Sequence, residues 1–185
     1  METNVLSPRR TSGKEKTYRA RRVYAAVFEL LLAALILSLL FFVWLRPVRI
    51  TGDSMAETLM DGEIVLIDRL ARFWKLPERG DMIAFATDEG LFIKRIVALP
   101  GETVEIADGD VFIGSVPLDE RLYAHGGIDT MPPVTVPEGS VFVLGDNRAK
   151  IYDSRLEAVG CIPYTELVGV LRARISPVSR VTLFF

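Results

Sequence analysis

The chain has 185 residues, with 22 lysines and arginines against 24 acids and a formal net charge of −2 at pH 7. Half of the residues are apolar, which excludes both a disordered chain and a polybasic protein that binds nucleic acid. The charge is unevenly distributed, because residues 1–22 hold seven basic side chains and two acidic ones. We therefore expect two parts of the chain to lie in different environments.

The first predicted element is a membrane-spanning helix over residues 23–45. This segment contains one side chain that is charged at neutral pH, Glu29, and neither glycine nor proline. As an α-helix it would be about 34 Å long, against a hydrocarbon core of roughly 30 Å. Trp44 at its end suits a membrane–water interface. A cleaved secretory signal is less favoured, because its apolar core is shorter and ends at small residues, whereas this run continues into Arg46.

The basic residues before the apolar segment predict the orientation of the chain. Because positively charged flanks stay on the cytoplasmic side, residues 1–22 are predicted to be a cytoplasmic tail. Residues 46–185 are then an extracytoplasmic domain, and the protein is expected to cross the cell membrane once. No later apolar run is long enough to span a bilayer.

Short apolar runs, many of them β-branched, recur between turn residues in the outer region. They cover residues 63–67, 82–86, 91–99, 103–106, 110–113, 140–144, 167–175 and 180–185. Strands of this length and spacing predict one mainly β domain, a sandwich or a barrel. Residues 118–133, with two glycines and two prolines, are predicted to form a longer loop or a small cap over the sheet.

The outer region has few residues for metal or histidine chemistry. It contains one histidine, His125, and one cysteine, Cys161, so we expect no metal site, no cofactor and no internal disulfide. His125 stands among turn residues and is interpreted as a solvated loop side chain rather than a base. Cys161 is interpreted as a small buried apolar residue. A catalytic pair of carboxylates is a further alternative, although scattered acids usually form a solvated surface.

Two stretches point to a different chemistry. Ser54 follows Gly52 in a turn shortly after the predicted span, and Lys94 lies inside the apolar run 91–99. Alone, such a lysine more often protects an edge strand or extends its amine to the surface. Together, the two residues permit a serine–lysine dyad. Burial can lower a lysine pKa by ~3 units, which leaves a neutral amine to accept the serine proton. The backbone N–H of Ser54 is then a natural donor to the oxyanion.

Four motifs follow one another along the chain: Gly52-Asp53-Ser54-Met55, residues 79–85, residues 94–102, and residues 145–148 with 153–155. In this order they resemble the motifs of type I signal peptidases, membrane-anchored peptidases that remove signal peptides from exported preproteins. The resemblance implies a signal-peptidase-like β-barrel or sandwich domain, with Ser54 as nucleophile, Lys94 as general base and an acyl-enzyme intermediate. It further implies that the site is supported by Gly52, Asp53, Met55, Arg95, Asp146, Arg148, Asp153, Ser154 and Arg155. The short chain is similar to Gram-positive members.

The same resemblance implies preproteins with signal peptides and membrane lipid as partners. Small side chains at the −1 and −3 positions would be recognised in an extended peptide laid along a strand. The candidates for that strand are the segment around Met55 and residues 82–86. Phe73 and Trp74, which lie between two basic residues, are expected either to dip into the membrane interface or to pack in the core.

Two positions depart from the family pattern. Glu57 stands where the family usually has proline, and Ile151 where it has a serine that hydrogen-bonds the lysine. Loss of that hydroxyl removes about 1 kcal/mol and should slow the enzyme rather than abolish it; the isoleucine should add apolar surroundings to the lysine. These departures leave a non-catalytic relative, a chaperone or assembly factor for exported proteins, as the alternative. A self-cleaving repressor with similar chemistry is disfavoured by the span and by the absence of an N-terminal DNA-binding domain.

Overall fold

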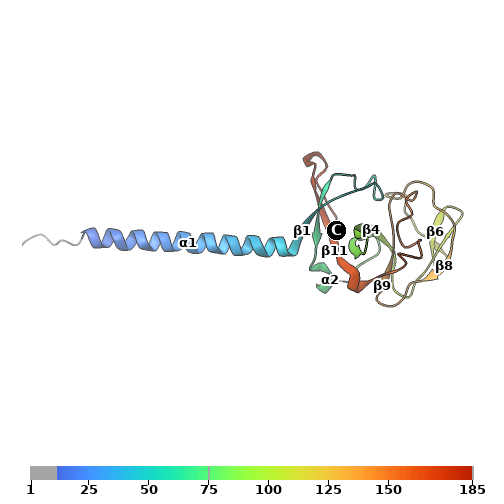
Figure 1. Ribbon diagram of the computed structural model, residues 1–185, viewed down its shortest axis with the longest axis horizontal. Helices are drawn as coiled ribbons and strands as arrows, with labels where there is room; N and C mark the ends of the chain where they lie inside the picture. Colours follow the sequence, from blue (N-terminus) through green and yellow to red (C-terminus); the bar gives the residue numbers. More distant parts are fainter. Residues whose placement is uncertain (1–11, 75, 185) are drawn as a thin grey trace, which may run out of the picture. The chain divides into compact units, whose positions relative to one another are not determined.

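The computed structural model of the protein describes residues 12–74 and 76–184 (Figure 1). The chain divides into two compact units, Met1–Val43 and Trp44–Phe185. The first eleven residues of the predicted tail, Lys75 and Phe185 lie outside the described residues.

The described residues of the first unit belong to one helix, α1, which spans Ser12–Trp44 and so begins inside the predicted tail. Its segment Arg21–Trp44 contains an 18-residue window with a mean hydropathy of 2.7 and is long and apolar enough to cross a membrane. The apolar side chains of this segment are exposed on all faces. The helix ends one residue before the predicted boundary, because Leu45 is the first residue of a strand.

The second unit is mainly β, which confirms the predicted fold class. Its strands are β1 (Leu45–Arg49), β2 (Ile64–Asp68), β3 (Met82–Thr87), β4 (Gly90–Ala98), β5 (Thr103–Ala107), β6 (Asp110–Ile113), β7 (Val116–Pro117), β8 (Met131–Thr135), β9 (Ser140–Leu144), β10 (Ile162–Pro163), β11 (Leu167–Ser176) and β12 (Thr182–Leu183). Three short helical turns complete it: α2 (Ala71–Trp74), η1 (Tyr164–Glu166) and η2 (Val178–Arg180).

These strands form two antiparallel sheets. The larger has the order β1-β2-β11-β3-β4-β9-β10, with β12 paired to β11, and the smaller has the order β7-β6-β5-β8. Figure 1 shows the smaller sheet, with β6 and β8, beyond β9 on the side of the domain away from β1.

Strands β4 and β9 lie between the apolar cores of the domain. Alternate residues of β9 belong to different clusters, with Val141 and Val143 in one and Phe142 and Leu144 in the other. Every residue of β9 is therefore buried. β4 is its neighbour in the sheet and is buried on both faces along its second half. A polar side chain in this part of β4 is consequently removed from water.

The strands that the sequence missed contain proline. β1, β7, β8 and β10 were not predicted, and β8 begins inside the predicted loop 118–133. All four are edge strands, where proline removes no hydrogen bond that the sheet needs. The C-terminal run was predicted too long as a strand, because residues 178–180 form a helical turn and β12 covers only Thr182–Leu183.

Candidate active site

A tight turn after β1 presents Ser54. Gly52 adopts a φ of 87°, a left-handed conformation that glycine reaches without steric cost, and its N–H donates to the Asp61 carboxylate at 2.9 Å. The next side chain, Met55, is buried in the same apolar cluster as Leu59. The turn is thus anchored by Met55 and leaves Ser54 partly exposed.

Lys94 lies in β4 with only 1% of its surface exposed. Burial lowers its pKa from 10.5 to about 8; Asp153 and Asp146 act to raise the pKa, and Arg155 to lower it. Among the described residues, no hydrogen bond or salt bridge to the Lys94 amine is found. The interpretation of Lys94 as an edge or surface lysine is therefore wrong.

Gly145, just after β9, is the point at which the serine turn and the lysine meet. A Cβ atom added to Gly145 would lie 2.5 Å from the Ser54 carbonyl oxygen and 3.5 Å from Lys94 Nζ. The Ser54 carbonyl oxygen and Lys94 Nζ are therefore separated by no more than the sum of these two distances. Asn147 fixes the arrangement, because its backbone N–H donates to the Ser54 carbonyl and its side chain to the Asp53 carbonyl, both at 3.1 Å.

Each buried acid near Lys94 is paired with an arginine. Arg95 donates to both oxygens of Asp146, at 2.8 and 2.7 Å, and Thr58 Oγ1 donates to the same carboxylate at 2.6 Å. Arg155 donates to both oxygens of Asp153, each at 2.8 Å. Much of the negative charge around the amine is thus neutralised by cations other than Lys94 itself.

The last predicted residues support the backbone. The Ser154 hydroxyl accepts a hydrogen bond from the N–H of Val143 at 3.0 Å, and Asp153 accepts one from Gly145 at 3.1 Å. Arg148 is buried, and its Nε donates to the Gly145 carbonyl at 2.9 Å. The predicted supporting residues therefore lie in the Ser54 turn, on β4, or in the segments 145–148 and 153–155 that follow β9.

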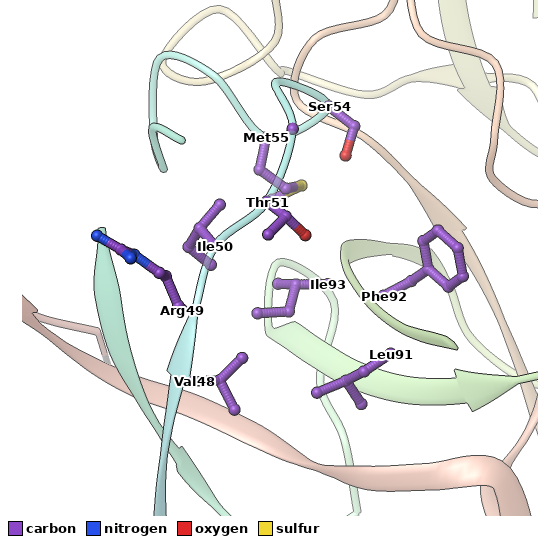
Figure 2. Close-up of a pocket in the computed structure, with 10 residues that line it drawn as sticks. Val48, Arg49, Ile50, Thr51, Ser54, Met55, Leu91, Phe92 and Ile93 are labelled. Carbon is purple, nitrogen blue, oxygen red and sulfur yellow. The ribbon is translucent and has the colours of Figure 1, made fainter. Parts of the chain in front are cut away.

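A cleft leads to Ser54 (Figure 2). It is lined by residues 48–52, Ser54, Met55 and residues 91–93. In one wall the Phe92 ring stacks on Tyr152 with 4.5 Å between centroids and on Phe85 with 6.1 Å. In Figure 2, Ile50 and Thr51 lie along one side of the cleft and residues 91–93 lie opposite.

Both sides of this cleft have unpaired strand edges among the described residues. β1 is an edge strand, and β9 pairs with β4 only from Arg95 to Ala98, which leaves one edge of residues 91–93 open. An extended peptide can add to such edges. Residues 82–86 were also predicted to bind the peptide. This prediction is wrong, because β3 is paired on both sides, to β4 and β11, and has no open edge.

Three other sequence predictions concern single residues. Ile151 has 51% of its surface exposed and lies outside the buried clusters, so it is not part of the core packing near Lys94. Cys161 is only partly buried, which raises the pKa of its thiol. His125 lies in a loop, as predicted, but its backbone pairs with the last motif, through hydrogen bonds to Asp146 and Arg148.

Sequence reasoning missed several residues at the site. Glu120 is ion-paired to Arg148, the Tyr123 ring packs on Arg95, and Arg174 Nη1 donates to the Thr58 carbonyl at 2.5 Å. All three contacts join segments far apart in the sequence, and no local spacing marks them. Gly145 belongs to the last of the four motifs, but only the structure explains why that position excludes a side chain.

A serine on a tight turn, a buried lysine and a cleft open to an extended peptide are typical of serine peptidases that use a lysine as base. Residues 21–176 match the family described as "Signal peptidase, peptidase S26". The chain belongs to this family, which confirms the resemblance drawn from the motifs and the assignment as a serine endopeptidase.

The chain is similar to named members of the family over most of its length. It is 38% identical to "Probable signal peptidase I-1" of Synechocystis over 82% of each chain. It is 32% identical to "Signal peptidase I S" of Bacillus subtilis, over 78% of this chain and 82% of the relative. A crystal structure of a signal peptidase I from Enterococcus faecalis is 34% identical, with a TM-score of 0.44, and covers 52% of this chain and 97% of its own.

The close approach at Gly145 yields a prediction. In Gly145→Ala the new methyl group would meet a backbone oxygen of the serine turn, which has to move. We expect kcat to fall by about 100-fold, because a misplacement of about 1 Å costs that much. Steady-state kinetics with a signal-peptide substrate measures this. Gly127→Ala is the matched control, since a Cβ there meets nothing within 4 Å. Equal activity of the two variants would contradict the prediction.

Proposed function

We propose that this protein is a membrane-bound endopeptidase that cleaves signal peptides from exported preproteins, with Ser54 as nucleophile and Lys94 as general base. The observation that carries the proposal is the burial of Lys94 beside the Ser54 turn, with the neighbouring acids paired to arginines. The names of the similar proteins, signal peptidases I among them, support the substrate class.

The proposed reaction has two stages. Neutral Lys94 accepts the Ser54 proton as Oγ attacks the scissile carbonyl, and the resulting ammonium returns a proton to the leaving amine. Water then attacks the acyl-enzyme with Lys94 again as base, which frees the carboxylate and restores the serine. Among the described residues, the Ser54 N–H makes no backbone hydrogen bond, so it is available to the oxyanion.

The cleft suits the residues around a cleavage site. An extended substrate can pair with residues 48–52 on one side and 91–93 on the other, which brings its scissile bond to Ser54. The apolar lining from Val48, Ile50 and Leu91 favours small apolar side chains in the substrate. We therefore assign the recognition of the −1 and −3 positions to this cleft.

We further propose that α1 anchors the enzyme, with the tail cytoplasmic and residues 46–185 outside, and that α2 of the outer domain contacts the lipid. Trp44 Nε1 donates to the Asp68 carboxylate at 2.8 Å, and the same oxygen of Asp68 accepts from the first N–H groups around α2. The side chains of Phe73 and Trp74 on α2 are 67% and 82% exposed, so they do not pack in the core. Aromatic side chains of this kind favour a membrane interface.

The dyad predicts the effect of two substitutions. Ser54→Ala and Lys94→Ala should each lower preprotein cleavage by at least about 1,000-fold, because each removes a group that the reaction needs. Cleavage of a preprotein by the full-length enzyme in detergent measures this, with Ser115→Ala, in an exposed turn, as control. If the wild type cleaves no faster than these two variants, the non-catalytic alternative is correct.

The lowered pKa of Lys94 predicts a pH profile. The base must be deprotonated, and its pKa of about 8 lies below the ordinary 10.5. Activity should therefore rise about tenfold per pH unit below pH 8 and level off above it. The measurement is kcat/KM against pH with a substrate that has no titrating groups in the range. A profile flat from about pH 6 to 10 would show that Lys94 is not the base.

The lipid contact predicts a fluorescence result. The chain has two tryptophans, so Trp44→Phe leaves Trp74 as the single reporter. In bilayers that contain lipids brominated near the headgroup, Trp74 emission should be quenched, and acrylamide in the water should quench it less than free indole. Trp74→Phe reports Trp44 for comparison. Full quenching by acrylamide with no effect of the brominated lipid would rule out the contact.

A further inference from the structure

One loop contacts two of the three arginines that support the site, Arg148 and Arg95. Residues 119–125, here the cap segment, lie between β7 and β8. Within it, Glu120 is buried, and its two carboxylate oxygens accept from the two Nη atoms of Arg148. This ion pair is itself buried, with 4% of the Arg148 side chain and 10% of the Glu120 side chain exposed. Such a pair holds its geometry because either partner left alone would be a buried unpaired charge.

Tyr123, in the same segment, contacts the second arginine, Arg95. Its ring packs against the Arg95 guanidinium, with 4.2 Å between Cζ and the ring centroid, and its hydroxyl lies 3.5 Å from Glu120 Oε1. Burial and the Glu120 charge raise the pKa of Tyr123 to about 12, so the phenol stays neutral over the working range of the enzyme. Arg95 is the residue that holds Asp146.

The backbone joins the cap segment to the motif at residues 145–148. The His125 N–H donates to the Asp146 carbonyl at 3.0 Å, and the Arg148 N–H donates to the His125 carbonyl at 2.8 Å. The cap segment and the motif are therefore linked by main-chain bonds and by side-chain contacts.

The contacts of the cap segment lead to the reacting groups through Gly145. The Gly145 carbonyl is held by Arg148, and its N–H by Asp153. Gly145 lies close to both the Ser54 carbonyl oxygen and Lys94 Nζ. We infer that Glu120 and Tyr123 are positioning residues, which keep Gly145 in place and thereby fix the distance between Ser54 and Lys94 and exclude water from the lysine. The inference rests on the proposed dyad.

Loss of Glu120 has a defined consequence. Arg148 would be a buried cation without a partner, so it would turn toward water and release the Gly145 carbonyl. Water would then reach Lys94 more easily. The charged groups that act on the amine, Asp153, Arg155, Asp146 and Asp53, would remain. A better hydrated amine binds its proton more tightly, so less of it is neutral at a given pH.

The test compares Glu120→Gln with Asp119→Asn, its neighbour in the sequence. Asp119 forms an ion pair with Arg121 on the same segment, but that pair is exposed and does not contact the site. For full-length Glu120→Gln in detergent we expect kcat to fall by about 10- to 100-fold with KM within about twofold. The pH at which the rate is half-maximal should rise by about one unit. Asp119→Asn should match the wild type in kcat, in KM and in the pH at which the rate is half-maximal.

Further variants keep the inference testable if Glu120→Gln is unstable. Tyr123→Phe keeps the ring on Arg95 and should retain most activity, whereas Tyr123→Ala should lose it with the same shift in pH profile. Glu120→Asp keeps the charge and should restore part of the rate. The amine can also be followed without turnover, by NMR titration of the chain with ¹³C-labelled lysine, whose five lysine signals are assigned with Lys94→Met.

The outcomes separate the two proposals. If folded Glu120→Gln and Tyr123→Ala have the kcat, KM and pH profile of Asp119→Asn, the positioning role is wrong. It is also wrong if Glu120→Gln only lowers the melting temperature or yield while the pH profile per folded enzyme stays unchanged. If instead Lys94→Ala keeps its activity, the proposed dyad is what fails.

Discussion

Burial of one amine is the constraint on which the rest of the site depends. A lysine in apolar surroundings must either pay a large desolvation cost as a cation or release its proton. In this domain β4 carries Lys94 between apolar clusters on both faces of the sheet, so the neutral form is favoured. The same packing that makes the strand stable therefore lowers the pKa of the lysine, as its proposed role as a base requires.

The need for a neutral lysine explains the arrangement of acids and arginines. Asp146 and Asp153 are required as acceptors, because they bind Thr58 and the Gly145 N–H and so hold the serine turn. Their negative charge alone would favour the protonated lysine. Pairing with Arg95 and Arg155 leaves the acids able to accept these hydrogen bonds while reducing their effect on the amine.

The sequence predicted those parts of the structure that have a local signal. Alternating or continuous apolar runs predicted most strands, including residues 110–113 and 140–144 with their observed bounds. β1 and β8 were missed because proline argues against a strand, although edge strands tolerate it. The position of a strand within the sheet has no local signal either, which is why residues 82–86 were predicted to bind peptide although β3 is central. Glu120 was missed for a similar reason, since its partner Arg148 is 28 residues away.

The open edges at the cleft create a second constraint. A binding site for extended peptide needs unpaired backbone, yet an unpaired strand edge also invites pairing with other chains. Arg46, Pro47 and Arg49 lie on β1, and charge and proline on an edge strand oppose uncontrolled pairing. Beyond them, residues 50–52 carry no charge and lead directly to Ser54. Pairing is thus opposed by charge and proline on β1, whereas residues 50–52, next to Ser54, have neither, as the proposed pairing with a substrate requires.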